Sequence, residues 1–397
     1  MDAFHVLKVF AGAVIAVSVS AHIVRSLVIP RARRTLLTRL MDAAVDALFR
    51  VLVRPFADYY RKDQILAVQG SVLLLVQLAT WLFGYLIAFS LMLWSGPRSF
   101  PAAMKEIGSS MFTLGFIYNG GGTEAALDIL AACFGLVVVA LQIAYLPTLY
   151  AAFSRRETEV TLLAARAGMP QWGPELLVRT RYGVATKTDD LPALYDRWER
   201  WAADVAESHS NYPVLVRFRS PQPLMSWLVA LLAVMDSAAM LLSLCPSRER
   251  MEPRRALRMG FTALRQIGGA MGLPVDLDPD PDAEIDLTFA QFSEAVDTLK
   301  SVGFPVEREA AEAWPHFRGW RVNYEALAYG LAERTDAVPA PWSGPRRWRA
   351  GTIPVQRPAN RRPSDAPGSV MPSEEQADRG EGDRGEGDPD GATAGAR

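Results

Sequence analysis

Long apolar stretches constrain this chain more than any other feature of its sequence. Residues 65–94 contain no ionisable side chain except Tyr85, and 30 residues exceed the ~20 that a helix needs to cross a bilayer. Residues 4–29 and 125–153 form two further runs of this kind. Such surfaces need lipid or protein around them, so the sequence predicts an all-α membrane protein with three transmembrane helices.

The first run also has some features of a cleaved signal peptide. It begins the chain, and small residues surround Ser20 and Ala21. However, it is longer than a usual signal sequence, and Asp2 balances its early charge, Lys8. The sequence therefore favours a first membrane helix, with cleavage after about residue 21 as the alternative.

Basic residues in the connecting loops predict the orientation in the membrane. The segment from Ser95 to Glu124 holds two, Arg98 and Lys105, whereas residues 31–62 hold eight: Arg31, Arg33, Arg34, Arg39, Arg50, Arg54, Arg61 and Lys62. The loop with eight is expected on the cytoplasmic side. This places the N-terminus outside and everything after residue 155 in the cytoplasm, in a multi-pass protein of a bacterial plasma membrane.

The basic loop has its own helical pattern. Apolar residues recur at helical spacing over residues 37–52, with Arg39, Asp42, Asp46 and Arg50 on other faces. The pattern fits a helix on the inner membrane surface, and it fits equally a soluble helix packed on the cytoplasmic domain.

The remainder reads as a helical cytoplasmic domain followed by a tail. Residues 227–244 are apolar enough for a fourth span, but Asp236 at their centre would be costly in lipid, so a buried helix is favoured. Beyond residue 335 the chain is rich in Pro, Gly and charge, which predicts disorder. The expected division has four parts: 1–64, the first membrane helix with the basic segment; 65–156, the central module; 157–335, the helical domain; and 336–397, the tail.

Catalytic and ligand-binding motifs are absent from the sequence. There is no phosphate-binding loop and no nucleophile elbow, so we expect no enzyme and no cofactor. The four histidines are scattered, and the acidic run from Asp276 to Asp282 lacks the Gly and Glu of a calcium loop, so no metal site is expected. A net charge of −1 gives no reason to expect nucleic-acid binding.

The segment between the second and third apolar runs has an unusual organisation. Pro101 opens a stretch long enough for a short helix, and the turn from Thr113 to Phe116 and a Gly-rich return follow it. Non-helical backbone at membrane depth survives only if it is buried or lines water. This order predicts a re-entrant loop whose backbone carbonyls face an aqueous axis.

With this segment, the chain resembles the pore module of potassium channels, and most closely the bacterial potassium-channel-like proteins with a large cytoplasmic domain. The positions that match the signature Thr-Val-Gly-Tyr-Gly are Thr113, Leu114, Gly115 and Phe116. The run from Tyr145 to Arg156 and the stretches Tyr212-Pro, Arg217-Phe-Arg-Ser-Pro221 and Ser226-Trp are also similar to that subgroup. The resemblance covers residues 65–160, and more loosely extends to about 335.

The resemblance implies a cation channel subunit, with K⁺ as the expected ion and four identical chains around one axis. Thr113, Leu114, Gly115 and Phe116 would form the selectivity filter, and Gly135 or Pro147 would be a hinge in the inner helix.

The chain departs from the family signature directly after the matched positions. Ile117 replaces the second filter glycine, and Tyr118 stands where an Asp is usual. Because glycine supplies backbone conformations that a β-branched residue resists, we expect weak selection of potassium over sodium. The alternatives are a plain external hairpin, a pore that no longer conducts, and a membrane-anchored scaffold or sensor.

Overall fold

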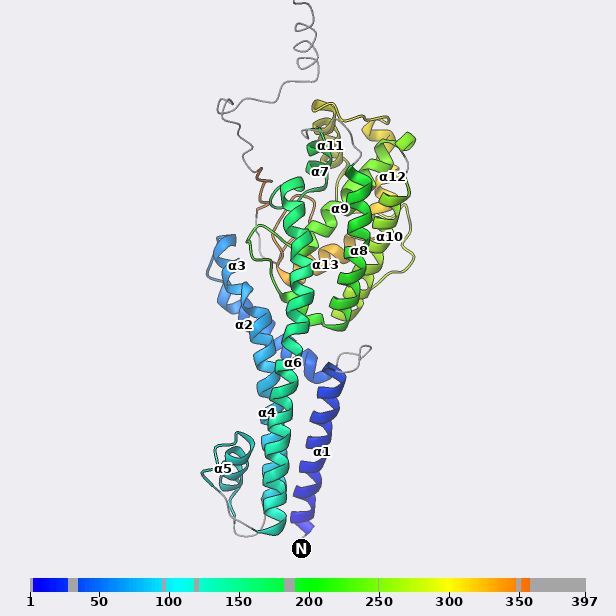
Figure 1. Cartoon of the computed structure of the whole chain (residues 1–397). Coiled ribbons are helices and arrows are strands. Elements are labelled where there is room, and N and C mark those ends of the chain that lie inside the picture. Colours follow the sequence, from blue (N-terminus) through cyan, green and yellow to red (C-terminus); the bar gives the residue numbers. More distant parts are fainter. Residues whose placement is uncertain are drawn as a thin grey trace, which may run out of the picture.

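The chain forms an elongated bundle of helices in the computed structural model, which describes residues 3–27, 35–94, 98–117, 121–181, 190–248, 250–347 and 351–357. Within these ranges all regular elements are helical, and one isolated β-bridge joins Met169 to Gln356. Figure 1 shows a narrow stalk, made of α1, α4 and the first part of α6, with a helical domain at one end. The N-terminal end of α1 lies at the far end of the stalk.

The bounds of the elements are as follows, in chain order: α1 (Ala3–Leu27), α2 (Leu36–Val53), α3 (Tyr59–Ala67), α4 (Gln69–Leu93), α5 (Phe100–Met111), α6 (Gly122–Ala167), α7 (Gly173–Arg179), α8 (Asp190–Asn211), η1 (Pro213–Arg217), α9 (Trp227–Leu244), η2 (Pro246–Arg248), α10 (Met251–Met271), α11 (Phe289–Ser301), α12 (Ala310–Arg321) and α13 (Glu325–Thr335). Four helical segments are long and apolar enough to cross a membrane: Phe4–Leu27, Tyr59–Leu93, Gly122–Ala167 and Trp227–Leu244.

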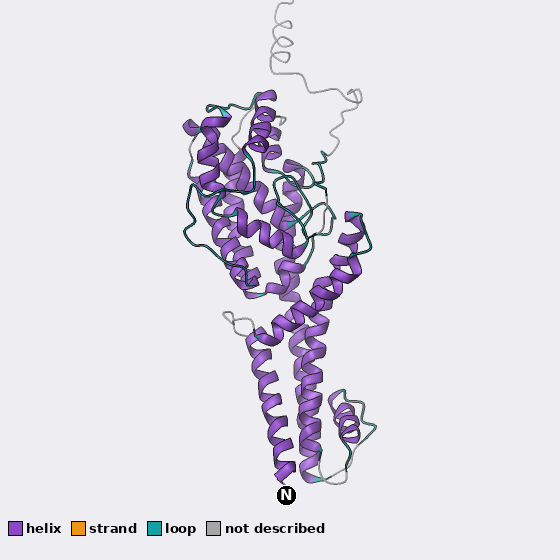
Figure 2. Ribbon diagram, turned by 180° about the vertical axis from the view of Figure 1, so that it is seen from behind, coloured by secondary structure: helices purple, strands orange, loops and turns teal. Residues whose placement is uncertain are grey.

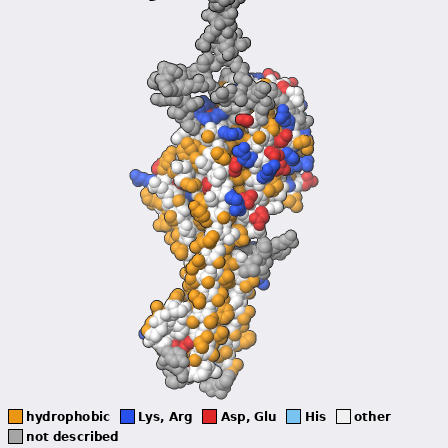
Figure 3. Space-filling view, viewed as in Figure 1, with side chains coloured by type: hydrophobic (Ala, Val, Ile, Leu, Met, Phe, Trp, Pro, Cys, Tyr) orange, Lys and Arg blue, Asp and Glu red, His pale blue; other side chains and the backbone are white. Residues whose placement is uncertain are grey.

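Small residues bring α1 and α4 into close contact in the stalk. A Cβ atom at Gly12 would lie 2.4 Å from the carbonyl oxygen of Ala88, and one at Gly84 would lie 2.8 Å from the side chain of Val19. Glycine at both positions therefore lets the two backbones approach. Figure 3 shows that apolar side chains dominate this face of the stalk, whereas charged side chains are dense on the helical domain.

Helix α2 carries apolar side chains on two faces. Its inner face packs on α3 and α4 through residues such as Val45 and Phe49. Its other apolar residues remain exposed in the single chain: Leu36, Leu40, Leu48, Val51 and Leu52. The helix predicted over residues 37–52 is therefore present, and it has an apolar surface that neither the stalk nor the helical domain covers.

The helical domain is built around α9. Contacts with α6, α7, α8, α10, α12 and α13 surround this helix, and all of its residues are buried. Asp236 at its centre accepts hydrogen bonds from the Arg321 guanidinium and the Tyr324 hydroxyl. Arg321 also contacts Glu325 and donates to the carbonyl oxygen of Trp342. The charge inside α9 is thus neutralised by protein, as expected for the buried helix that the sequence favours.

The packed chain extends beyond the boundary expected at residue 335. Val338 and Trp342 are buried in the core of the domain, and Arg346 donates hydrogen bonds to the carbonyl oxygens of Ala337 and Val338. Gln356 pairs with Met169 through both backbone groups. The disordered tail predicted over 336–397 therefore begins too early, because its first residues supply apolar side chains to the core. Residues 358–397 lie outside the described residues.

Candidate pore loop and its link to the helical domain

The short helix α5 folds back against α4 and α6 rather than capping their ends. Both cartoon views place it beside the stalk (Figures 1 and 2), and Ala103, Ile107 and Met111 are buried in the same apolar cluster as Trp81 and Phe89 of α4. Ser99 precedes the helix in an extended conformation, and Pro101 lies in its first turn, where the missing N–H costs nothing.

The C-terminal end of α5 reaches deep along α6. A Cβ atom at Gly135 would lie 2.6 Å from the carbonyl oxygen of Met111, so the two backbones touch there. Gly135 follows Gly122, the first residue of α6, by 13 positions, or about 20 Å at 1.5 Å per residue. Since the hydrocarbon core of a bilayer is about 30 Å thick, the turn after α5 lies at membrane depth if α6 spans a bilayer.

One serine organises the backbone of the turn after α5. The carbonyl oxygen of Ser109 accepts hydrogen bonds from the N–H groups of Leu114 (2.8 Å) and Gly115 (3.4 Å). The Oγ of the same serine accepts from the N–H groups of Phe116 (3.0 Å) and Ile117 (3.2 Å). Four consecutive backbone donors therefore point toward the end of α5.

The carbonyl oxygens of the same turn have no such partners. None of the carbonyls of Thr113, Leu114, Gly115 and Phe116 accepts a hydrogen bond from any residue that the structure describes. The side chains of Leu114 and Phe116 are also 63% and 65% exposed. The N–H groups of Leu114 to Ile117 are thus bonded within the loop, whereas the carbonyl oxygens of Thr113 to Phe116 remain available as acceptors in the described chain, and carbonyl oxygens are groups that bind cations.

Two residues of the turn adopt the left-handed backbone conformation. Their φ angles are 55° at Thr113 and 67° at Gly115. Ile117, which we expected to be forced into a glycine-like conformation, is not among the described residues with positive φ. Any strain therefore falls on the β-branched Thr113 instead. Tyr118 lies outside the described residues.

Polar contacts tie the pore loop to the first turns of α6. The Oγ of Ser110 donates to Asp128 at 2.9 Å. Arg98, just before α5, forms ion pairs with Glu106 (3.4 Å) and Glu124 (3.0 Å). Sequence reasoning did not anticipate this set, because the partners are separated by up to 26 positions along the chain.

Helix α6 runs unbroken through both predicted hinge positions. Gly135 serves here as the contact point for Met111, as described above. Pro147 removes one hydrogen-bond donor from the helix interior, so the carbonyl four residues earlier loses its partner. The role of either residue as a hinge stays a prediction.

Two arginines connect the helical domain to α2 and α3: Arg217, the last residue of η1, and Arg219, two residues later. Arg217 is nearly fully buried, and its guanidinium lies 2.9 Å from Asp46 of α2. Arg219 lies 2.6 Å from Asp63 of α3 and also donates to the backbone carbonyl of Asp336. Burial raises the pKa of Asp336 to about 6, although the nearby arginines oppose that shift. In the sequence, Arg217 belongs to a stretch that is similar to potassium-channel-like proteins, but the sequence predicted no partner for it.

A buried arginine also fixes α6 where it enters the helical domain. Arg156 donates hydrogen bonds to the carbonyl oxygens of Leu215 (2.8 Å) and Phe218 (2.7 Å). Its guanidinium lies 2.9 Å from His209. Burial and the adjacent positive charge of Arg156 lower the pKa of His209 well below its usual value. His209 is therefore neutral and accepts from Arg156, so α6, α8 and η1 meet in one network.

The acidic run of the helical domain forms turns of its own. Asp276 and Asp280 each accept a hydrogen bond from the backbone two residues on, and Asp282 pairs with Arg318. Among the described residues there is no group of three or more side chains that could hold a metal ion.

No family model matches the chain, and comparisons with curated proteins and with solved structures found no match either. The resemblance to potassium-channel-like proteins therefore rests on the sequence motifs alone.

Proposed function

We propose that the chain is one subunit of a cation-conducting pore in a membrane. The observation that carries the proposal is the polarity of the turn after α5. Its N–H groups are held by Ser109, and its carbonyl oxygens are unpaired within the described chain. If α6 spans a bilayer, these carbonyls lie at a depth where water is otherwise absent. Carbonyl oxygens arranged in this way replace part of the hydration shell of an ion such as K⁺.

A pore of this kind requires several copies of the chain. A single copy leaves Phe112, Leu114 and Phe116 at least half exposed beside unpaired carbonyls. Such a backbone is not stable against lipid, so neighbouring subunits must cover it or enclose water with it. A closed ring of identical chains does both, and the sequence resemblance implies four.

In this proposal α1, α4 and α6 span the bilayer and α9 does not. The burial of α9 and the pairing of Asp236 with Arg321 give it no surface for lipid. Together with the basic loop, this favours a plasma-membrane protein with its N-terminus outside and its helical domain in the cytoplasm.

Selectivity for potassium over sodium is expected to be weak. Among the described residues of the turn, Thr113 and Gly115 have positive φ and Ile117 does not, so the backbone lacks the second glycine-like position that the repeating filter twist requires. Phe116 also lacks the hydroxyl that would tie the turn to its surroundings.

Cation flux into liposomes containing the purified protein tests the proposal. The informative variant is Ser109→Ala, which removes the two hydrogen bonds to Phe116 and Ile117 and should reduce flux or change the ratio of potassium to sodium flux by about tenfold or more. The matched control is Ser90→Ala in α4, a buried serine whose hydroxyl has no hydrogen-bond partner among the described residues.

The oligomeric state in mild detergent supplies the second readout. A tetramer with cation flux that Ser109→Ala alters and Ser90→Ala preserves is the expected result. A monomer without flux contradicts the proposal and favours the membrane-anchored scaffold or sensor.

A further inference from the structure

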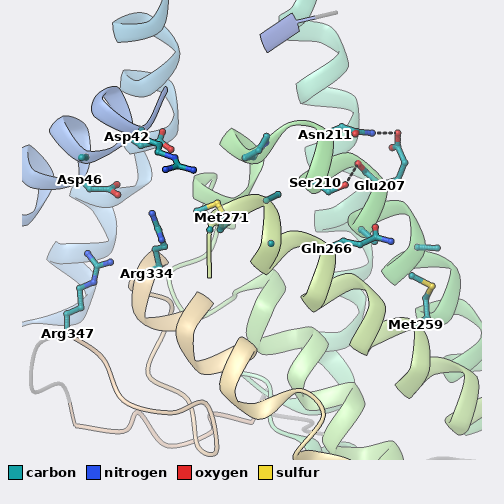
Figure 4. A pocket seen from close by; sticks show the side chains of 18 of the residues that line it. Asp42, Asp46, Glu207, Ser210, Asn211, Met259, Gln266, Met271, Arg334 and Arg347 are labelled. Carbon is teal, nitrogen blue, oxygen red and sulfur yellow. Dashed lines mark hydrogen bonds between the residues drawn. The ribbon is translucent and has the colours of Figure 1, made fainter. Parts of the chain in front are cut away.

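A cavity of about 1200 Å³ lies between α2 and the helical domain. Helix α2 forms one wall, and α8, α10 and the end of α13 form the others (Figure 4). The figure shows Asp42, Asp46, Arg334 and Arg347 at one end of the cavity, with Glu207 and neighbouring polar side chains at the other. The cavity thus joins a stalk-side helix to the domain at the level of the Arg217 contact.

Most of the charged side chains that line the cavity without a direct ion pair are arginines. Arg39, Arg334 and Arg347 line it, and no direct ion pair joins any of them to a carboxylate of the described chain, although the charge of Arg347 opposes the raised pKa of Asp336. A fourth lining arginine, Arg50, donates to a backbone carbonyl of its own helix.

The carboxylates of the cavity are already engaged. Arg217 lies 2.9 Å from Asp46 and 3.9 Å from Asp42. Glu207 accepts a hydrogen bond from the side-chain amide of Asn211. The groups left to meet a ligand are therefore mainly cationic, and they come from two separate parts of the fold.

We propose that this cavity binds a phosphate-bearing anion. Guanidinium groups match phosphate oxygens in geometry and keep their charge at all physiological pH values. The volume is at or slightly above the upper end of ordinary ligand pockets, which is ample for a phosphorylated headgroup or a nucleotide-sized ester. Met259 and Met271 add apolar wall for the part of the ligand that carries no charge.

The ligand can reach the cavity from two sources that share this chemistry. The exposed leucines of α2, such as Leu40 and Leu48, form an apolar surface suited to the edge of a bilayer, which brings phospholipid headgroups close to Arg39. The cavity is also partly open at the protein surface, so a soluble phosphate ester has access.

Binding would link α2 to α13 and to Arg347, because the arginines of both sides contact one anion. This inference concerns binding alone and stands whether or not the pore conducts.

Titration of the full-length protein in detergent tests the inference with three probes: inorganic pyrophosphate, a short-chain phosphatidylglycerol, and a short-chain diacylglycerol with the same tails. The test variant is Arg39→Gln combined with Arg334→Gln, and the matched control is Arg200→Gln on the exposed face of α8. Unchanged elution from a sizing column shows that each variant is folded.

We expect a phosphate-bearing probe to bind, diacylglycerol not to bind, and the double variant to bind about tenfold more weakly for each arginine removed. Binding of phosphatidylglycerol alone identifies a lipid headgroup, binding of pyrophosphate alone identifies a soluble ester, and binding of both supports the shared chemistry. Absence of binding by either phosphate probe, or equal affinity in the double variant and in wild type, would overturn the proposal.

Discussion

Helices α6 and α9 are both apolar enough to cross a membrane, yet their surroundings differ completely. In the most apolar part of α6, 22% of the residues are buried in the structure, whereas in α9 the share is 100%. Helix α6 leaves side chains such as Leu136 and Ile143 open, and α9 is enclosed by other helices on all sides. Hydropathy alone therefore does not separate a lipid-facing helix from a core helix; the neighbours available to cover it do.

The acidic residue within α9 shows the same dependence on neighbouring residues. Asp236 in α9 meets Arg321 and Tyr324, which come from α12 and from just beyond it. Partners of this kind are not visible from the apolar pattern, because they lie more than 80 positions further along the chain. An acidic residue inside an apolar run thus argues against a lipid environment, whereas the partner that it meets is identified only by the folded structure.

The largest effect is expected from truncation after Thr335, which removes apolar side chains from the core cluster that contains α9. Deleting Val338 and Trp342 takes buried apolar side chains from the core and removes the carbonyl that Arg321 binds, at a cost on the order of 5 kcal/mol. Thermal unfolding of the domain would reveal it. A chain ending at Arg357 is the control and should melt like the full chain; equal melting of both truncations would show that α9 does not need these side chains.

Loss of the buried arginine should have the next largest effect. Arg321→Met leaves Asp236 and Glu325 without their positive partner and should destabilise the domain by about 3–5 kcal/mol. Chemical denaturation followed by tryptophan fluorescence measures the change. Arg200→Met, on the exposed surface, should change stability by less than about 0.5 kcal/mol. If Arg321→Met is equally mild, the network does not hold α9.

A charge on the exposed face of the stalk tests the other side of the comparison. Val17 of α1 is 68% exposed, and Val17→Arg should disfavour membrane insertion by about 2.5–3.5 kcal/mol if that face meets lipid. The fraction of chains inserted into microsomes is the measurement, with Val17→Leu as the control. Insertion of the arginine variant at the wild-type level would mean that α1 has another environment.

The smallest effect concerns Asp336, whose backbone carbonyl binds Arg219 where the helical domain contacts α3. The pKa of Asp336 is raised from 3.8 to about 6, so the folded protein holds this proton more tightly than the unfolded chain. This contribution to stability is complete below pH 4 and is lost as the pH rises to about 6, by about 1–3 kcal/mol. Asp336→Asn should remove this part of the pH dependence of unfolding between those values. An identical pH profile in the variant would contradict the assignment.

Much of the architecture was predictable because it depends on local patterns. The apolar runs marked the helices of the stalk, Pro101 marked the start of α5, and the polar centre of residues 227–244 argued for burial. The contacts between distant segments were not predictable. The pairing of Arg217 with Asp46 spans 171 positions, and no local pattern reports it.

Some features of the candidate pore loop were likewise predictable from the sequence, and others were not. Its position between two apolar helices followed from the order of segments, and Gly115 was expected in a conformation that glycine favours. The role of Ser109 was missed, because a serine that accepts four backbone donors looks like any other polar residue in the sequence. Likewise, the tail was expected to start at residue 336 because Pro and Gly dominate its composition, although Trp342 within it is a core residue.

Helix α6 acts geometrically as a lever. Its 46 residues span about 70 Å at 1.5 Å per residue, and the part between the pore-loop contact at Gly135 and the Arg156 network accounts for about 32 Å. A rigid rod of about 32 Å that tilts by about 5° about Arg156 moves Gly135 by about 3 Å, or about half the rise of one helical turn. Small rotations of the helical domain would therefore be passed along α6 to the contact between Gly135 and Met111, provided that the helix stays straight at Pro147.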